Sequence, residues 1–499
     1  MPSNIGVSIV ERESSDAGRI VPSDIFTIGC VSTSLRGPVD VAVALYNITE
    51  DKRVYGEFGR AYLGGYVRRG LFNNCREYGA RVYNVRVLGS DAVSATLVVN
   101  GAASTPAPSW AITSGYLGHA SPGLDGNNVK VEIKASQGDT ANRDLYVYYK
   151  GPKDSAAVLK EVHTELNLLN VVSIVNAKSV YVMVALSNGA TLVPAVKAST
   201  SLATGADGAA VSQTEYTAAF SKLNGLEIPM IFNADLHSFA SAGATQTYVE
   251  GRGSSMGIIA SAYGASIATL TTDYTAYIKA KSFMVGYRGW VNVEDEYGGT
   301  IMVPAIGHAI GAGWIRKAVE RGGYPWIAPA GPSTSLRDVI NLEVAGYTPG
   351  EVDTLVQTVG FNPIMFVPGS GFIIRTSRTF SSVRKNYSAH VRRTTNFFIS
   401  TFKNAFMWIE QESNSEDTRR RVRDGLKFFS QDCYRNGAFG TRGGFDNNVK
   451  IKCDEENNSQ DMQDRGELAC DFAFHPVEAV ESATINIFQT RDNLNVSDN

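Results

Sequence analysis

Cysteine, histidine and net charge are all scarce in this chain of 499 residues. The five cysteines include no C-x-x-C pair and the six histidines no H-x-x-x-H pair, so no metal site, redox motif or bound cofactor is expected. A net charge of −3 argues against a dedicated nucleic-acid-binding protein, which usually carries a basic excess. No basic segment followed by an apolar one opens the chain, so we expect no secretory signal and reduced cysteines.

Uncharged stretches of about membrane length occur at 253–272 and 297–315. The first is rich in Ser and Thr, and the second contains Pro304, His308 and several glycines. Buried helices or strands explain both better than membrane spans. With 43% hydrophobic and 19% charged residues, the composition is that of a folded, multi-domain, soluble protein.

The first ninety residues alternate between strand and helix patterns. An apolar run at 25–31 predicts a buried strand, and apolar spacing predicts a helix over 62–78. Alternation at 81–87 predicts the next strand, so this segment is typical of an α/β unit. We expect the core to resume with a strand at 228–233 and a buried helix at 257–270.

Residues 91–205 have a different sequence pattern from the first ninety residues. Short alternating segments are separated by stretches rich in Gly, Ser, Ala and Pro. This pattern predicts a β-rich domain inserted into the α/β core. The predicted fold class is α/β in an α+β multi-domain chain. Its expected parts are an N-terminal arm (1–20), a core (21–90 and 206–345), the inserted domain (91–205), a C-terminal α+β domain (346–482) and a C-terminal arm (483–499).

The last third predicts two amphipathic helices, at 390–412 and 416–435, followed by two strands. Ser415 suits the N-cap of the second helix and Asn436-Gly437 suits its end. Cys453 and Cys470 fall on the apolar faces of the two strands. They are either two small buried thiols or, if the strands pair in register, a disulfide.

Each end of the chain carries an alternating segment with no partner nearby in the sequence. A lone strand needs a sheet edge with which to pair. The apolar residues of these two segments are Ile5, Val7, Ile9, Ile485, Ile487 and Phe488.

Charge is unevenly distributed near the C-terminus. Residues 375–452 hold 16 basic and 7 acidic residues, whereas 453–499 hold 2 and 11, which gives net charges of +9 and −9. The two segments are either solvated faces that neutralise each other in one fold or complementary patches between subunits. The candidate interface residues are Arg419, Arg420, Arg421, Arg423, Asp454, Glu455 and Glu456.

One segment, Gly253 to Gly257, matches the G-x-S-x-G pattern of a hydrolase nucleophile. The pattern is short, Gly and Ser are abundant, and no suitable Asp and His context follows. We therefore predict a tight turn leading into a helix, and no enzyme.

A series of short motifs extends from Gly37 to Pro476. The C-terminal third thereby resembles the conserved domain of contractile phage tail sheath proteins, and the earlier motifs resemble the same family. The motifs are Gly37-Pro38, the P-G-x-x-G-N turn within 120–127, W-x-x-P-A-G at 326–331, the segment 350–364, Arg393-Thr394, Asn436-Gly437-Ala438-Phe439, the segment 449–457, Gly466-Glu467-Leu468 and Pro476.

The resemblance implies a structural subunit and not an enzyme. Sheath subunits stack as hexameric rings around a tail tube in a high-energy extended state, then contract and drive the tube through the cell envelope for genome delivery. The family implies a subtilisin-like core, a protruding inserted domain, and arms that add strands to neighbouring subunits. The two terminal segments, with Ile5, Val7 and Ile9 and with Ile485, Ile487 and Phe488, are the candidate arms and so the expected subunit contacts. The implied partners are other copies of the chain and the tail tube, baseplate and tail terminator proteins, with no direct nucleic-acid or membrane binding.

The implied location is the tail of a virion, assembled in the host cytoplasm. Two other readings stay open: the sheath of an R-type bacteriocin or another non-viral contractile injection system, and, remotely, a serine hydrolase.

Overall fold

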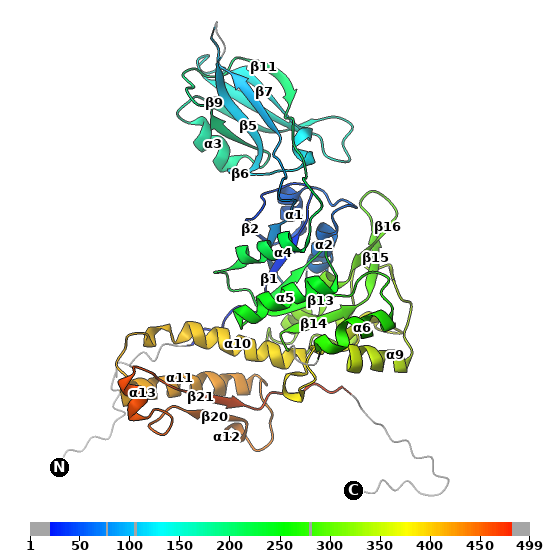
Figure 1. The fold of residues 1–499 in the computed structure, drawn as a ribbon, viewed down its shortest axis with the longest axis vertical. Coiled ribbons are helices and arrows are strands. Elements are labelled where there is room, and N and C mark those ends of the chain that lie inside the picture. Colours follow the sequence, from blue (N-terminus) through cyan, green and yellow to red (C-terminus); the bar gives the residue numbers. More distant parts are fainter. Residues whose placement is uncertain (1–19, 76–77, 104–106, 279–281, 482–499) are drawn as a thin grey trace, which may run out of the picture.

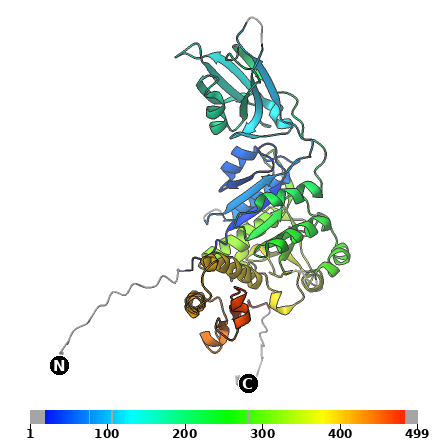
Figure 2. The same ribbon diagram turned by 60° about the vertical axis from the view of Figure 1, so that its left-hand side comes forward.

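The computed structural model describes residues 20–75, 78–103, 107–278 and 282–481. Three parts follow one another along its longest axis (Figure 1): a β-rich upper lobe, a central α/β sheet, and a lower layer of helices with a short hairpin. The view turned by 60° keeps this order (Figure 2), so the central sheet separates the other two parts. The mixed α/β, multi-part architecture confirms the predicted fold class at that level. No helix among these residues is long and apolar enough to cross a membrane.

The central sheet is parallel through most of its width. Within the described residues its eight strands follow the order β19-β18-β14-β13-β12-β1-β3-β2, with antiparallel pairing at the two edges. β1 and β12 to β14 are buried at every position, as expected for strands covered on both faces. The bounds are β1 (Thr27–Ser32), β2 (Ala42–Leu45), β3 (Arg81–Arg86), β12 (Met230–Asn233), β13 (Met256–Ala260), β14 (Met284–Arg288), β18 (Phe361–Val367) and β19 (Gly371–Ile374).

Helices cover both faces of this sheet, and each face has its own apolar cluster. One cluster joins the sheet to α2, α7 and the π-helical segment Ile310–Arg316, and the other joins it to α4, α5 and α6. A small sheet of β15 (Trp290–Glu294), β16 (Thr300–Pro304) and β17 (Asn341–Leu342) lies beside it. The helices are α1 (Ile48–Tyr55), α2 (Leu63–Cys75), α4 (Gln213–Phe220), α5 (Phe239–Arg252), α6 (Ile267–Ile278), α7 (Ile306–Ala309), α8 (Lys317–Glu320) and α9 (Pro349–Asp353).

Two glycines allow α7 and the segment after it to lie directly against α2. A Cβ atom at Gly307 would lie 1.9 Å from the carbonyl oxygen of Val67, and one at Gly311 would lie 2.4 Å from that of Leu71. The backbone of α2 cannot move far enough to make room for a side chain at these distances, so both positions require glycine for the helices to pack. Within the uncharged stretch 297–315, residues 303–315 are buried, as expected, whereas 297–300 are exposed.

The upper lobe packs two sheets around an apolar centre that contains Trp110 and Val147. One sheet orders its strands β10-β5-β4, with β6 beside β5, and the other orders them β11-β7-β8-β9. Helix α3 (Val171–Lys178), which the sequence pattern did not predict, packs on β10. The strands are β4 (Thr96–Asn100), β5 (Pro108–Tyr116), β6 (His119–Ala120), β7 (Val129–Ala135), β8 (Arg143–Tyr149), β9 (Val158–Leu166), β10 (Val182–Leu186) and β11 (Lys197–Ser201).

The lower layer contains the two long helices predicted from the sequence. α11 (Glu416–Arg435) has the predicted bounds, and the Ser415 side chain accepts a hydrogen bond from the Thr418 N–H. α10 (Ala389–Ala405) ends earlier than predicted, and a 3₁₀ turn at Met407–Ile409 follows it. The remaining elements are α12 (Phe445–Asn448), β20 (Val449–Lys452), α13 (Gln460–Asp464) and β21 (Asp471–Phe474).

The predicted helix at 257–270 is wrong. Residues Met256–Ala260 form the central strand β13, and α6 begins at Ile267. Periodicity does not distinguish a short, fully apolar run in a buried strand from part of a buried helix. The adjacent β-branched residues Ile258 and Ile259 favour the strand.

The interior position of β13 makes its core side chains important for stability. Ile258 is 0% exposed, so Ile258→Ala should lower the free energy of unfolding by about 2–5 kcal/mol through lost burial and a cavity. Urea denaturation of both proteins measures this change. Leu169→Ala is the control: this side chain is 95% exposed, so a change within about 0.5 kcal/mol is expected. Equal effects of the two substitutions would contradict the placement of β13.

Candidate assembly surfaces

The lower layer ends in a two-stranded sheet with open edges. β20 and β21 pair antiparallel from Val449↔Phe474 to Lys452↔Asp471, and within the described residues no third strand joins them. An unpaired strand edge presents backbone N–H and C=O groups to which another strand can bind. This hairpin is therefore a candidate site for a strand from another chain.

Aromatic side chains hold the hairpin against the helices. Phe398 on α10 contacts Phe472 and Phe474 on β21, with ring centroids 5.5 and 5.1 Å apart, and also contacts Phe439. A lone two-stranded hairpin is marginally stable in water. The cluster supplies the packing that keeps both edges in place without a third strand.

The predicted basic residues of α11 have different surroundings. Arg419 is 3% exposed, with its Nε 3.3 Å from a Glu416 carboxylate oxygen. Arg420 is exposed and pairs with Asp417 at 2.5 Å. The Arg421 guanidinium lies 4.4 Å from the ring centroid of Trp408. Arg419 is buried and paired within the chain, whereas Arg420 is exposed. Arg420 is therefore more accessible to a charged group of another subunit.

Arg423 and the predicted acidic residues lie near the end of β20. Arg423 Nη1 donates to the carbonyl oxygen of Cys453 at 3.4 Å. Asp454 accepts from the backbone N–H of Glu456 at 3.0 Å, and Glu456 also pairs with Lys452. Glu455 and Glu456 are exposed. This turn therefore presents negative charge at the surface while its backbone is held locally.

A buried arginine joins the lower layer to the central sheet. Arg393 on α10 donates from Nη2 to the carbonyl oxygen of Ile25 at 3.1 Å, and its guanidinium lies 5.3 Å from the ring centroid of Trp314. Burial lowers the pKa of Arg393 to about 9. Nearby, Trp326 Nε1 donates to the carbonyl oxygen of Asn436 at 2.9 Å. These contacts make the two parts one packed body.

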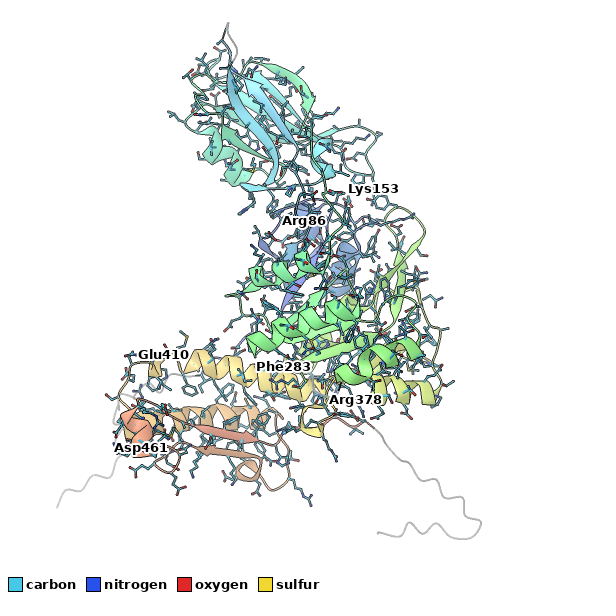
Figure 3. The ribbon with its side chains drawn as sticks, viewed as in Figure 1. Arg86, Lys153, Phe283, Arg378, Glu410 and Asp461 are labelled. Carbon is cyan, nitrogen blue, oxygen red and sulfur yellow. The ribbon has the colours of Figure 1, made fainter. Side chains whose placement is uncertain are left out.

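A second buried arginine joins the upper lobe to the sheet (Figure 3). Arg86 on β3 donates to the carbonyl oxygens of Gly37 and Pro122, both at 2.8 Å. Burial lowers the pKa of Arg86 to about 10. At the same junction Lys153 lies 3.2 Å from a Glu296 carboxylate oxygen. Pro122 belongs to the P-G-x-x-G-N turn, so this sequence motif forms a structural joint.

The segment after β21 is attached to the root of α10. Arg378 pairs with Glu481 at 2.6 Å, Ser388 donates to Glu478 at 3.2 Å, and His390 Nε2 lies 3.2 Å from the carbonyl oxygen of Val477. A hollow of 520 Å³ opens here, and Arg378 and Glu481 line it (Figure 3 labels Arg378). The chain continues toward the predicted C-terminal arm from this anchored point.

The G-x-S-x-G segment is not arranged as a nucleophile elbow. Ser255 is 0% exposed, donates to the carbonyl oxygen of Ile228 at 2.5 Å and accepts from Arg252 Nε at 2.9 Å. It precedes strand β13, and so the predicted turn into a helix is wrong. In the described part of the chain no three His, Cys, Asp or Glu side chains gather to hold a metal ion.

The predicted arm residues lie outside the described residues. They are Ile5, Val7, Ile9, Ile485, Ile487 and Phe488.

Residues 375–490 match the family model of the phage tail sheath C-terminal domain. The chain is also 25% identical over 167 residues to the tail sheath protein of Vibrio phage KVP40. That alignment spans 33% of this chain and 24% of the relative, so it covers about a quarter of the relative's length.

Solved sheath structures share the fold of nearly the whole chain. The sheath tail protein of Listeria innocua has a TM-score of 0.59 at 13% identity, over 88% of this chain and 91% of that one. The contracted helical sheath of the anti-feeding prophage has a TM-score of 0.59 at 13% identity, over 98% and 100% of the two chains. The fold is thus that of contractile sheath proteins. The predicted resemblance to contractile phage tail sheath proteins is confirmed by these matches together.

His390 makes the anchorage after β21 sensitive to acid. Burial lowers the pKa of His390 from 6.5 to about 4. Between these two pH values the unfolded chain binds a proton at His390, whereas the folded chain does not. Stability should fall as the pH falls through this window. Glutamine can also bond the Val477 carbonyl but does not titrate. Wild type should therefore lose ~2 kcal/mol more than His390→Gln between pH 7 and 4.5 in denaturant titrations. Parallel pH profiles of the two proteins would contradict this assignment.

Proposed function

We propose that this protein is the structural subunit of a contractile phage tail sheath. It polymerises as stacked rings around the tail tube in a high-energy extended state, and contracts to drive the tube through the host envelope for genome delivery. The observation that carries the proposal is the joint match: residues 375–490 fit the sheath C-terminal domain, and the fold of nearly the whole chain follows that of sheath proteins.

The internal joints suit a subunit that moves as a rigid body. Arg393 connects the lower layer to the sheet, and Arg86 connects the upper lobe to it, both through backbone carbonyl groups. Packed parts of this kind shift as units, whereas their outer contacts can rearrange. Contraction is then a change between subunits, with the fold of each preserved.

Strand addition explains how subunits stay connected during that change. The arm segments with Ile5, Val7 and Ile9, and with Ile485, Ile487 and Phe488, would pair with the open edges of β20 and β21 on neighbouring subunits. Backbone hydrogen bonds provide the affinity and do not depend on how the rigid bodies are oriented. Exposed charges such as Arg420, Glu455 and Glu456 would guide subunits into register.

The proposed partners follow from this role. They are other copies of the chain in hexameric rings, the tail tube, and the baseplate and tail terminator proteins, with assembly in the host cytoplasm and residence in the virion tail. The proposed parts are the arms (1–20 and 483–499), a subtilisin-like core (21–90 and 206–345), a protruding domain (91–205) and an assembly domain (346–482). The doubly covered parallel sheet supports the core, and the separate lobe in Figure 1 supports the protruding domain.

A non-viral contractile injection system is the second candidate, because the anti-feeding prophage sheath matches as well as the Listeria protein. Electron microscopy of particles from the producing cells separates the two. Sheathed tails on DNA-filled capsids support the phage, whereas sheathed tubes without capsids support the non-viral machine. Discrete particles without tubes would contradict both sheath candidates and would favour a serine hydrolase instead. The burial of Ser255 argues against that function.

The N-terminal arm provides the sharpest test of strand addition. Deletion of residues 1–13 should leave a folded monomer that cannot polymerise, because the donated strand is lost. Changing Val7 and Ser8 together to proline should have the same effect, since successive N–H groups face opposite edges and proline removes both. Sedimentation and negative-stain microscopy measure tube formation.

Threonine at the same two positions is the matched control, because it keeps both N–H groups and favours extended structure. The threonine variant should form normal tubes. Normal tubes from the deletion or the proline variant would show that this arm does not connect subunits.

A further inference from the structure

Cys453 and Cys470 lie opposite each other where the β20–β21 pair ends. The last paired residues are Lys452 and Asp471, so continuing the register by one residue aligns the two cysteines. Their side chains are hydrogen bonded to each other, and both are free thiols in the structure. A disulfide requires that the two strands pair in register, and β20 and β21 are paired in this way.

The position also suits a covalent bond. The His475 N–H donates to the carbonyl oxygen of Asn448 at 2.8 Å, which marks a hydrogen-bonded pair. Such pairs alternate with non-hydrogen-bonded ones, so the register, continued by one residue, gives the cysteines a non-hydrogen-bonded position. At such positions in antiparallel ladders the Cα atoms are about 4.5 Å apart, within the roughly 4.4–6.8 Å found across disulfides.

The surroundings favour a bond within one chain. Cys453 is 0% exposed and packs with Val422 and Leu426 of α11, whereas Cys470 is half-buried. A small oxidant can reach the outer sulfur, but a second protein chain cannot reach the inner one.

Neighbouring groups favour the thiolate form of Cys453 over that of the other thiols. The hydrogen bond from Cys470 lowers the pKa of Cys453, and the positive charges of Arg423 and Arg419 on α11 act in the same direction. Burial and Asp454 oppose them, whereas the hydrogen bond to Cys453, burial and Asp471 raise the pKa of Cys470. The thiolate is the reacting form of cysteine.

The remaining cysteines have no such activation. Burial raises the pKa values of Cys30, Cys75 and Cys433 to about 12. They are therefore inert by comparison.

We propose that Cys453 and Cys470 form a redox site that closes to an intramolecular disulfide when the protein meets a small-molecule disulfide. In the first exchange Cys470, the sulfur that a small oxidant can reach, loses its proton and attacks the small disulfide as the thiolate, which releases one thiol. In the second, the other sulfur displaces the remaining thiol. Two protein thiols are oxidised, and one small disulfide is reduced to two thiols. The new bond closes the 454–469 loop and holds the register of the hairpin.

Oxidised glutathione and the full chain, purified under reducing conditions, provide the test. After incubation, the wild type should lose two of its five titratable thiols, and non-reducing peptide mapping should find the Cys453 peptide linked to the Cys470 peptide. Cys433→Ser, a buried cysteine in the same layer, should leave this linkage intact. Cys470→Ser should abolish it.

Retention of all five thiols, under conditions that oxidise a reference dithiol peptide, would overturn the proposal. Linkage between chains, seen as dimers on non-reducing gels, would also overturn it. Both readouts come from the wild type, so they hold even if a variant fails to fold.

The rate of disulfide formation provides a second test, because the positive charge of Arg423 favours the thiolate of Cys453. Arg423→Gln should slow disulfide formation severalfold near neutral pH and shift the rate profile to higher pH, because less thiolate is present. Arg420→Gln is the matched control, since Arg420 is exposed and pairs with Asp417. Equal rates for the two variants would overturn the assigned role of Arg423.

Discussion

Arg393 is buried where the long helix α10 meets the central sheet, and its Nη2 atom bonds the carbonyl oxygen of Ile25. Removing a guanidinium from water is costly, which is why its pKa falls to about 9. Arg86 repeats this arrangement at the other side of the sheet, where it bonds carbonyl groups of Gly37 and Pro122. These bonds link the lower layer and the upper lobe to the central sheet at the two junctions.

The open hairpin of β20 and β21 is important because it belongs to a subunit whose parts are linked in this way. β20 and β21 leave both outer edges without a strand in the described part of the chain, yet the phenylalanine cluster around Phe398 holds them firmly in place. An edge that is rigid and unpaired is suited to receive a strand from elsewhere. The proposed sheath needs this combination of a subunit that does not deform and links that tolerate rotation.

The sequence predicts local features well, because their causes are local. α11 was predicted with its bounds, since an N-cap serine and a terminal Asn-Gly surround one amphipathic pattern. Strand β13 was misread as helix, because apolar residues such as Ile258 and Ile259 suit both. Helix α3 was missed, since Val171, Val172 and Val175 suggest strand as much as helix.

The joints could not be predicted, because they connect residues distant in the chain. Arg393 and Ile25 are 368 positions apart, and Trp326 and Asn436 are 110 apart. Arg393, Trp326 and Asn436 all belong to motifs that pointed to the family, but pattern alone does not say that two of them touch. The pairing of Cys453 and Cys470 likewise needed the observed register.

The central claim is that rigid subunits are joined by exchanged strands on the open edges of β20 and β21. Cryo-electron microscopy of the assembled polymer in its extended and contracted forms tests it most directly. The account predicts extra strands from neighbouring subunits beside β20 and β21 in both forms, with the Arg393 and Arg86 junctions unchanged. Bare edges in either form, or parts that reorient within one subunit, would contradict it.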